Sequence, residues 1–186
     1  MTAPADPLRS RWWTRANALT ALRLVAAPAL AAAVLAGAPG LALFLFSLAV
    51  ATDLLDGRVA RRFGEASPLG GLLDHATDAT FVTAGLGALA CRGEVPLVLP
   101  GLVAAAFVQY TLDSRAVAGR PLRASALGRC NGIAYFVLLG VPVVRDGLGL
   151  GWPEASWVHA LGLALVATSL VSMADRALAL RRPRAS

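Results

Sequence analysis

The chain has 186 residues, enough for one domain, of which 57% are hydrophobic and only 15% are charged, with a formal net charge of +6. This apolar fraction is well above that of an average soluble domain. Every basic residue is an arginine, and the arginines cluster in short segments between long apolar runs. That distribution excludes the basic stripe of a soluble nucleic-acid-binding domain and favours a polytopic membrane protein.

Six apolar stretches are long enough to cross a bilayer, whose hydrocarbon core needs roughly 20 residues per helix. In chain order they cover about residues 17–37, 41–61, 69–91, 96–115, 126–144 and 156–179. We therefore predict an all-α integral membrane domain of six transmembrane helices over residues 17–180. A cytoplasmic interfacial segment, 1–16, precedes it, and a basic cytoplasmic tail, 181–186, follows it.

The arginines that flank the spans predict the orientation. If the N-terminus is cytoplasmic, Arg92 and Arg145 are the arginines left on the opposite side. This asymmetry predicts cytoplasmic N- and C-termini in the inner (cytoplasmic) membrane of the cell. Arg23 and Pro28 interrupt the first apolar stretch, so we do not expect it to be a cleaved signal peptide.

Four aspartates lie within these spans. Asp53 and Asp56 fall in the last third of the second span, and Asp74 and Asp78 in the first third of the third. Spacings of three and four residues place each pair on one helix face. Since neighbouring spans are antiparallel, the two pairs are expected to face each other at similar depth on the cytoplasmic side.

Such a cluster needs compensating positive charge. One ionised aspartate at a helix centre costs roughly 2.5–3.5 kcal/mol on insertion scales, and like charges held together repel. Two divalent cations would neutralise four carboxylates, and hard oxygen ligands suit Mg²⁺ or Mn²⁺. The alternative is a set of structural ion pairs at the helix ends.

Small residues surround the aspartates. Gly57 and Ala60 follow Asp56, and Gly70 precedes Asp74, leaving room for a phosphate-bearing ligand to approach the backbone. Close helix packing is the alternative explanation. Arg61 is then a candidate phosphate clamp.

The whole segment resembles the motif of a known family, the CDP-alcohol phosphotransferases. The match covers every fixed position of Asp53-x2-Asp56-Gly57-x2-Ala60-Arg61-x8-Gly70-x3-Asp74-x3-Asp78. Two further segments resemble bacterial phosphatidylglycerophosphate synthases, the second with arginine in place of lysine: Asn17-Ala-Leu-Thr20-Ala-Leu-Arg23-x4-Pro28 and Ser125-x2-Gly128-Arg129. Six spans with cytoplasmic termini also suit this family.

The resemblance implies a phosphatidyltransferase of phospholipid biosynthesis. It would transfer a phosphatidyl group from CDP-diacylglycerol to an alcohol, with glycerol 3-phosphate as one candidate, and release CMP. By position, Asp53, Asp56, Asp74 and Asp78 would hold two Mg²⁺ (or Mn²⁺) ions, and Asp78 would also be the general base. The CDP pocket would consist of Asp53, Asp56, Gly57, Ala60, Arg61 and Gly70. The resemblance also implies a homodimer, and no nucleic acid is expected as a partner.

The acceptor stays open at this point. Arg115 and Arg129, at the cytoplasmic ends of the fourth and fifth spans, and the intramembrane Arg23 are candidates for an acceptor or lipid phosphate. The local pattern Asp74-His75-Ala-Thr-Asp78-Ala79 looks more like the choline and ethanolamine phosphotransferases, whose acceptor is diacylglycerol. A divalent-cation transporter is the alternative of another class, and it predicts acidic residues distributed across the membrane.

Overall fold

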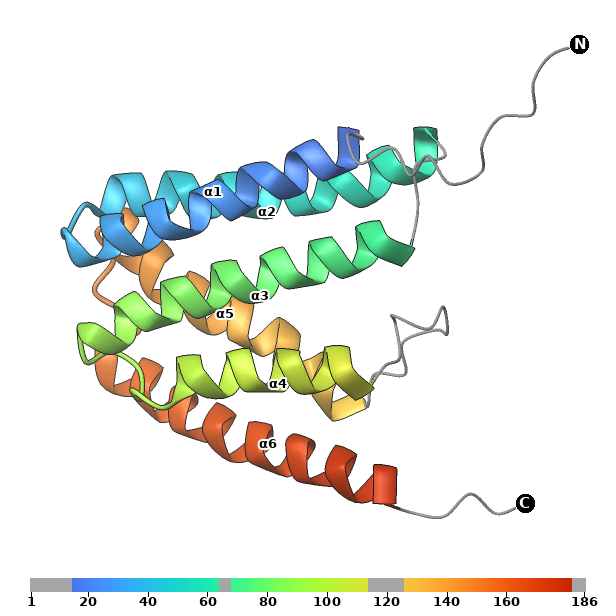
Figure 1. The fold of residues 1–186 in the computed structure, drawn as a ribbon. Coiled ribbons are helices and arrows are strands. Elements are labelled where there is room, and N and C mark those ends of the chain that lie inside the picture. Colours follow the sequence, from blue (N-terminus) through green and yellow to red (C-terminus); the bar gives the residue numbers. More distant parts are fainter. Residues whose placement is uncertain (1–14, 64–67, 114–125, 182–186) are drawn as a thin grey trace, which may run out of the picture.

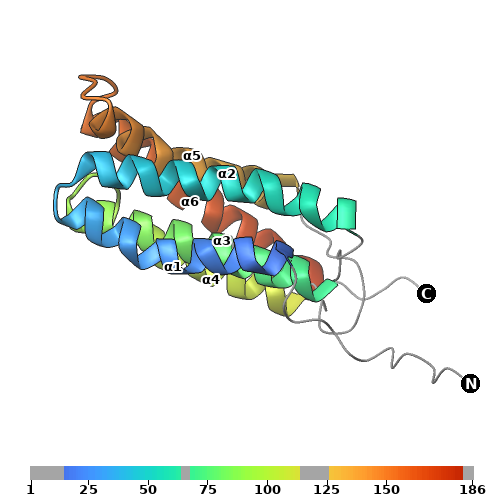
Figure 2. The ribbon, with the colours of Figure 1, turned by 90° about the horizontal axis from the view of Figure 1, so that it is seen from above.

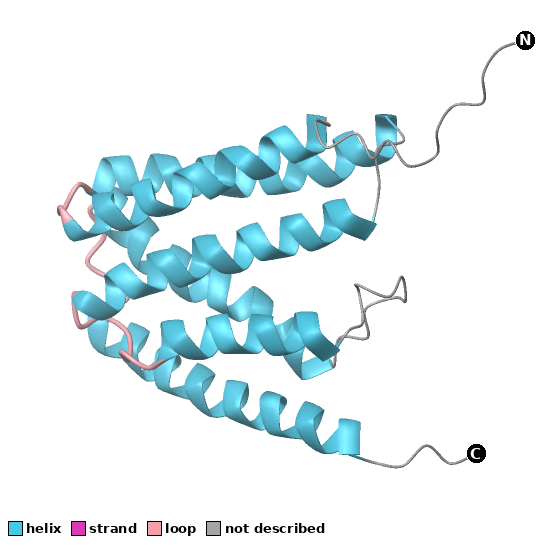
Figure 3. Ribbon diagram, in the orientation of Figure 1, coloured by secondary structure: helices cyan, strands magenta, loops and turns pink. Residues whose placement is uncertain are grey.

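The structure, a computed structural model, describes residues 15–63, 68–113 and 126–181. Every regular element in these ranges is an α-helix (Figure 3), which confirms the predicted all-α class. The helices are α1 (Arg15–Leu35), α2 (Pro39–Phe63), α3 (Pro68–Cys91), α4 (Leu99–Asp113), α5 (Ala126–Gly147) and α6 (Ala155–Arg181).

Three connections of the same design join the helices in pairs. After α1, α3 and α5 a glycine adopts a left-handed conformation, with φ of 64° at Gly37, 77° at Gly93 and 65° at Gly149. The amide after each glycine donates to the carbonyl five residues back, as in the 3.0 Å bond from Glu94 N to Leu89 O. These are Schellman caps, which end a helix and favour glycine because it lacks a Cβ. They turn the chain back on itself, so that each pair forms an antiparallel hairpin.

The hairpins assemble into one up-and-down bundle. α1 packs against both α2 and α3, α2 packs against α5, and α4 and α5 each pack against α6. The glycine turns gather at one end of the bundle, on the left in Figure 1. The start of α3 and the ends of α2, α4 and α6 lie at the other end, and Figure 2 shows the same separation from above. This arrangement places the last turns of α2 and the first turns of α3 at the same end of the bundle, with α1 packed against both helices.

The apolar core lies toward the glycine-turn end. Its largest fully buried members are Leu30, Phe81, Leu86, Leu89, Leu138 and Leu139. Helix approach is close at Gly140, where a Cβ would come within 2.6 Å of the Phe46 ring. The outer surface carries large exposed apolar side chains such as Val25, Phe44 and Leu163. An apolar exterior around an apolar core fits a protein surrounded by lipid.

Four of the six helices are long and apolar enough to cross a membrane. The qualifying segments are Ala18–Leu35, Pro39–Asp56, Leu127–Gly147 and Ala155–Leu178. The apolar part of α4, Leu99–Leu112, is shorter, and α3, which does not qualify, carries two aspartates, a histidine and three threonines among its apolar residues. The chain is a multi-pass membrane protein by this composition, while the six-span topology with cytoplasmic termini stays a prediction.

Candidate functional site

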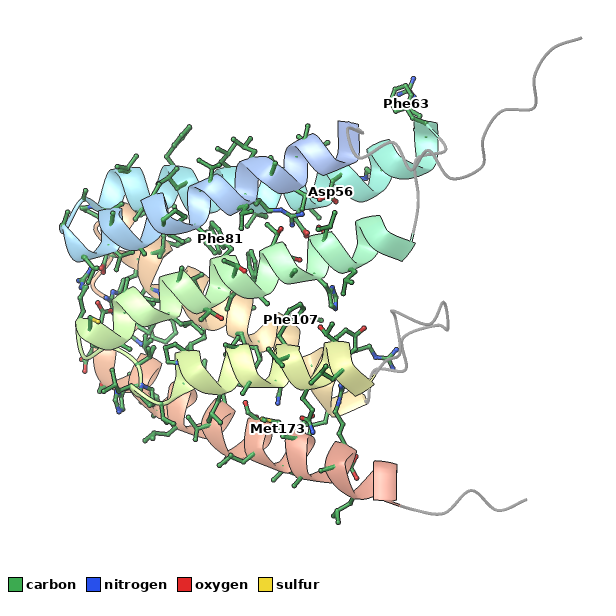
Figure 4. All side chains as sticks on the ribbon, viewed as in Figure 1. Asp56, Phe63, Phe81, Phe107 and Met173 are labelled. Atoms are coloured by element: carbon green, nitrogen blue, oxygen red, sulfur yellow. The ribbon has the colours of Figure 1, made fainter. Side chains whose placement is uncertain are left out.

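All four predicted aspartates converge on one arginine from α1. The Arg23 Nη1 atom lies 2.5 Å from Asp53 Oδ1 and 2.6 Å from Asp78 Oδ1. Its Nη2 atom lies 2.5 Å from Asp56 Oδ2 and also contacts Asp74 Oδ1. The Arg23 side chain is 1% exposed. Figure 4 shows Asp56 in this region, between α2 and α3.

The sequence spacing explains how two helices present this cluster. Residues three apart on α2 and four apart on α3 each share a face. α1 packs against both helices, so a long side chain from its first half reaches the space between the two pairs. The side chains of Asp53, Asp74 and Asp78 stay 42%, 33% and 30% exposed, whereas that of Asp56 is 9% exposed. The cluster is therefore closed toward α1 and open on another side.

Arg23 supplies part of the compensation that the cluster needs. One guanidinium (+1) among four ionised carboxylates (−4) leaves a formal charge of −3. A guanidinium offers five donors; the two terminal nitrogens bind carboxylates here, and the Nε atom is buried without a hydrogen-bond partner within the described ranges. The cluster keeps both its excess negative charge and its partial exposure.

The donor set fits a divalent cation. Asp53, Asp56 and Asp74 each offer an oxygen, and these oxygens lie within 4.8 Å of one another. Carboxylate oxygens are the ligands that Mg²⁺ and Mn²⁺ prefer. The four carboxylates already surround one cationic group, the Arg23 guanidinium.

A cavity of about 650 Å³ opens beside the carboxylates. Asp53, Asp78 and other residues of α2 and α3 line one side of it, and α4, α5 and α6 supply the rest of the wall. Phe107 and Met173, labelled in Figure 4, are part of that wall. Most of its other lining side chains are apolar, so the cavity suits a ligand with both apolar and polar parts.

Aromatic and basic side chains line the cavity near the end of the bundle opposite the glycine turns. The His75 and Tyr110 rings pack with centroids 5.3 Å apart, and the Arg176 guanidinium lies 5.0 Å from the centre of the Tyr110 ring. Arg129, which the sequence suggested for a phosphate, also lines the cavity and is exposed. Neither arginine has a carboxylate partner within the described part of the chain. Both guanidinium groups are therefore available to an anionic ligand.

The remaining predicted site residues lie in different parts of the chain. Gly57, Ala60 and Arg61 lie on the last turns of α2, and their side chains fall outside the described part of the structure. Gly70 lies on α3, one turn before Asp74. Arg115 lies outside the described residues. For Arg23, the structure shows engagement with the aspartates, and its assignment to an acceptor or lipid phosphate stays a prediction.

Sequence reasoning missed several residues of the cavity. Gln109, Tyr110, Asn131 and Arg176 all line it, from α4, α5 and α6. Amides and basic groups inside otherwise apolar spans are themselves a signal, because such residues face a bundle interior or a cavity in membrane proteins.

The comparison with protein families agrees with the motif and the site. The family model for CDP-alcohol phosphatidyltransferase matches residues 13–173, which include Arg23, all four aspartates and most of the cavity wall. The chain belongs to the CDP-alcohol phosphatidyltransferase family. This confirms the resemblance found in the sequence.

The chain is similar to relatives that differ in their named products. A cardiolipin synthase (CMP-forming) of Streptomyces coelicolor is 31% identical over 63% of this chain and 60% of its own length. A probable phosphatidylglycerophosphate synthase of Mycobacterium tuberculosis is 30% identical over 88% of this chain and 78% of its own. A CDP-diacylglycerol–glycerol-3-phosphate 3-phosphatidyltransferase of Cereibacter sphaeroides is 41% identical over 40% of this chain and 35% of its own length.

The chain spans between 16% and 78% of the length of the curated relatives that it matches. No solved structure matches it at a significant level. Activity, substrates and partners therefore have to be argued from the site.

Proposed function

We propose that this protein transfers a phosphatidyl group from CDP-diacylglycerol to an alcohol acceptor and releases CMP. The observation that carries this proposal is the convergence of four carboxylates beside a large cavity, in a chain of the CDP-alcohol phosphatidyltransferase family. Glycerol 3-phosphate is the leading acceptor, supported by the names of the Mycobacterium and Cereibacter relatives. A phosphatidylglycerol acceptor is the second candidate, supported by the Streptomyces relative and by the volume of the cavity.

The aspartates have distinct roles in this proposal. Asp53, Asp56, Asp74 and Asp78 would hold two Mg²⁺ (or Mn²⁺) ions, which would stabilise the charge that develops on the phosphate groups. Asp78 lines the cavity, so its carboxylate faces the space where an acceptor hydroxyl would lie. It would take the proton of that hydroxyl. The acceptor oxygen bonds to the phosphatidyl phosphorus, and the bond from that phosphorus to the CMP oxygen breaks.

Arginines would hold the phosphate groups of the substrates. Arg61, with Gly57, Ala60 and Gly70, would bind the CDP moiety from the cytoplasmic end of α2 and α3. Arg129, with Arg115 as a further candidate, would bind an acceptor or lipid phosphate, because a guanidinium forms bidentate hydrogen bonds to phosphate.

Arg23 neutralises part of the carboxylate cluster. If divalent cations held by the aspartates took over that compensation, the Arg23 guanidinium would be available to bind a phosphate oxygen, the role that the sequence suggested for it.

The setting of the reaction is part of the proposal. The enzyme would lie in the inner membrane, with its carboxylates facing the cytoplasm, since the CDP group of the donor must meet a water-soluble or interfacial acceptor. A homodimer is proposed on the resemblance to the family. Other reactions are a CDP-choline or CDP-ethanolamine phosphotransferase that acts on diacylglycerol, and divalent-cation transport.

The test is a CMP-release assay on detergent-purified protein with CDP-diacylglycerol and Mg²⁺. Glycerol 3-phosphate, phosphatidylglycerol, serine and an inositol phosphate are offered separately, and CDP-choline or CDP-ethanolamine with diacylglycerol forms a second arm. Acceptor-dependent CMP release in the first arm is expected. Activity confined to the second arm would reverse the donor assignment, and inactivity in both arms would contradict the proposal.

A further inference from the structure

We propose that one acyl chain of the lipid donor enters and lies in a wedge between α2 and α5, through which the cavity opens toward the surrounding lipid. The wedge is the part of the cavity lined by Val50 and Leu54 on α2 and by Ile133 and Val137 on α5. This inference rests on the proposed function, because it places the lipid half of that donor. It is supported by the divergence of the two helices and by the exposure of the side chains between them.

α2 and α5 pack tightly near the glycine turns. A Cβ on Gly147 would come within 2.6 Å of the Leu43 side chain, and the Phe46 and Phe136 rings pack with centroids 5.5 Å apart. About one turn before Phe136 on α5, a Cβ on Gly132 would meet nothing within 4 Å. Figure 1 shows α5 running away from α2 toward the same end of the bundle. The two helices therefore converge at the Phe46–Phe136 contact and separate beyond it.

The wedge opens on the apolar exterior of the molecule. Leu54, Ile133 and Val137 line the cavity, and they are also 58%, 69% and 52% exposed. The cavity-lining residues Val82 on α3 and Val103 on α4 are buried. The cavity is thus closed at these positions of α3 and α4 and open between α2 and α5. Since lipid surrounds a multi-pass membrane protein, a hydrocarbon chain can pass this opening without leaving an apolar environment.

The wedge begins next to the place of the donor diphosphate. Asp53, which the proposed function puts at that diphosphate, lines the cavity and directly precedes Leu54 on α2. From Asp53 back to Phe46 the wedge covers about seven residues of α2, or roughly 10 Å. This length is about a third of the hydrocarbon core of a bilayer. The wedge therefore holds the first part of one chain, and the rest of that chain lies among the surrounding lipids.

The lining of the wedge fits a hydrocarbon chain and not a polar acceptor. Its four side chains are aliphatic and carry no hydrogen-bonding group. The narrow end is closed by Phe136, which packs against Phe46 and stacks on Phe81 with centroids 6.1 Å apart. Glycerol 3-phosphate would lose its hydrogen bonds to water there without gaining others. The chain belongs to the donor because the wedge begins at Asp53, and phosphatidylglycerol is the competing lipid.

The first test locates the donor chain in wild-type protein. CDP-diacylglycerol with a diazirine in the first half of one chain is photolysed on the detergent-purified enzyme with Mg²⁺ and without acceptor, and mass spectrometry identifies the labelled residues. Label is expected in the wedge and at residues that face lipid, such as Val25 and Leu163. Excess unlabelled CDP-diacylglycerol should remove most of the wedge label and leave the label at Val25 and Leu163. An equal excess of phosphatidylglycerol should leave all of it.

The second test fills the wedge with Val137→Trp. A helical side chain covers the turn on its N-terminal side, so this tryptophan would enter the wedge from α5, near the Phe46–Phe136 contact and away from Asp53. The ratio of kcat/KM for CDP-dioleoylglycerol to kcat/KM for CDP-dibutanoylglycerol, whose chains are short, is expected to fall about 10-fold, because overpacking excludes the long chain. Val171→Trp makes the same change at an exposed valine of α6 outside the cavity wall and should keep the wild-type ratio.

The outcomes separate this placement from the proposed function. The ratio is measured within one preparation, so a smaller folded fraction in a variant cancels. In an active wild-type enzyme, wedge label that excess donor does not remove, or that phosphatidylglycerol removes equally well, would overturn the placement and leave the proposed function intact. An unchanged ratio in Val137→Trp would do the same. No CMP release from wild-type protein with any acceptor would overturn the proposed function itself.

Discussion

Replacement of Arg23 by glutamine tests whether its guanidinium is the internal counterion of the carboxylate cluster. The variant removes the cation that contacts all four aspartates and leaves them facing one another. Removing one partner of a buried ion pair costs about 3–5 kcal/mol. Three of the four carboxylates are 30–42% exposed and partly screened by solvent, so the lower end, about 3 kcal/mol, applies.

This loss should be visible in thermal unfolding of the detergent-purified protein. For a chain of this size, about 2–4 °C of melting temperature corresponds to 1 kcal/mol, so we expect Arg23→Gln to melt about 6–12 °C below wild type in EDTA. Mg²⁺ should raise the melting temperature more in the variant than in wild type, because the ion no longer competes with a guanidinium for the carboxylates. Circular dichroism during heating measures both effects.

Two variants control the experiment. Arg58→Gln removes an exposed arginine from α2 and should melt within about 1–2 °C of wild type, since surface substitutions change stability by at most about 0.5 kcal/mol. Arg23→Lys keeps the positive charge without the planar guanidinium, so its melting temperature should fall less than that of Arg23→Gln. If Arg23→Gln melts like wild type in EDTA, or if Mg²⁺ stabilises both proteins equally, the counterion role is refuted.

Three further results are expected. Chelation of divalent cations by EDTA should abolish CMP release, and Mg²⁺ or Mn²⁺ should restore it. Ca²⁺ should restore less activity, because it prefers more ligands at longer distances. Full activity in EDTA would contradict the metal site. Glu94→Ala should lower stability by about 1.5–3 kcal/mol, measured by urea or thermal unfolding, because Arg92 and Arg145 lose the carboxylate that lies 3.0 and 2.7 Å from them while they keep Asp146 as a second partner. Unchanged stability would show that Glu94 contributes little to this ion-pair network. In a Cys130→Ala background, a membrane-impermeant maleimide should label the exposed Cys91 from the side of the membrane opposite the cytoplasm. Labelling from the cytoplasmic side alone would reverse the predicted orientation.

Hydrophobic length predicted the helices well. The six predicted spans correspond one to one to α1–α6, with ends that differ by a few residues. Gly37 and Gly93 end two of these helices, because left-handed backbone conformations restrict the residue type. The spans predicted at α3 and α4 are not confirmed, because α3 carries polar residues of the site and the apolar part of α4 is short.

The aspartate cluster was also predictable, since spacings of three and four fix which residues share a helix face. The cationic partner of this cluster, Arg23, was not predictable from spacing. Arg23 lies between 30 and 55 residues from the carboxylates that it contacts, and no periodicity relates α1 to the other two helices. The compensating charge was therefore assigned to metal ions, whereas the structure also provides a guanidinium.

The composition of the cavity wall depends on a still more distant relation. Gln109 and Asn131 line one cavity, and the Tyr135–Ser169 and Gln109–Met173 contacts set the heights of α4, α5 and α6. Sequence alone does not contain these heights, because apolar helices can slide past one another by a turn and bury similar surface. Packing decides the register, and with it the residues that line the cavity.

The most direct test of the central claim is transfer of a labelled phosphatidyl group by Asp78→Asn beside Asp175→Asn. Asp175 is an exposed aspartate on α6, outside the cluster and the cavity wall, so it is a matched control for the same chemical change. With CDP-diacylglycerol, Mg²⁺ and glycerol 3-phosphate or phosphatidylglycerol, we expect Asp78→Asn to lose at least about 100-fold in kcat, as for removal of a general base. Its melting curve should stay cooperative, and Asp175→Asn should keep wild-type activity. Near-normal transfer by a folded Asp78→Asn protein would contradict the account.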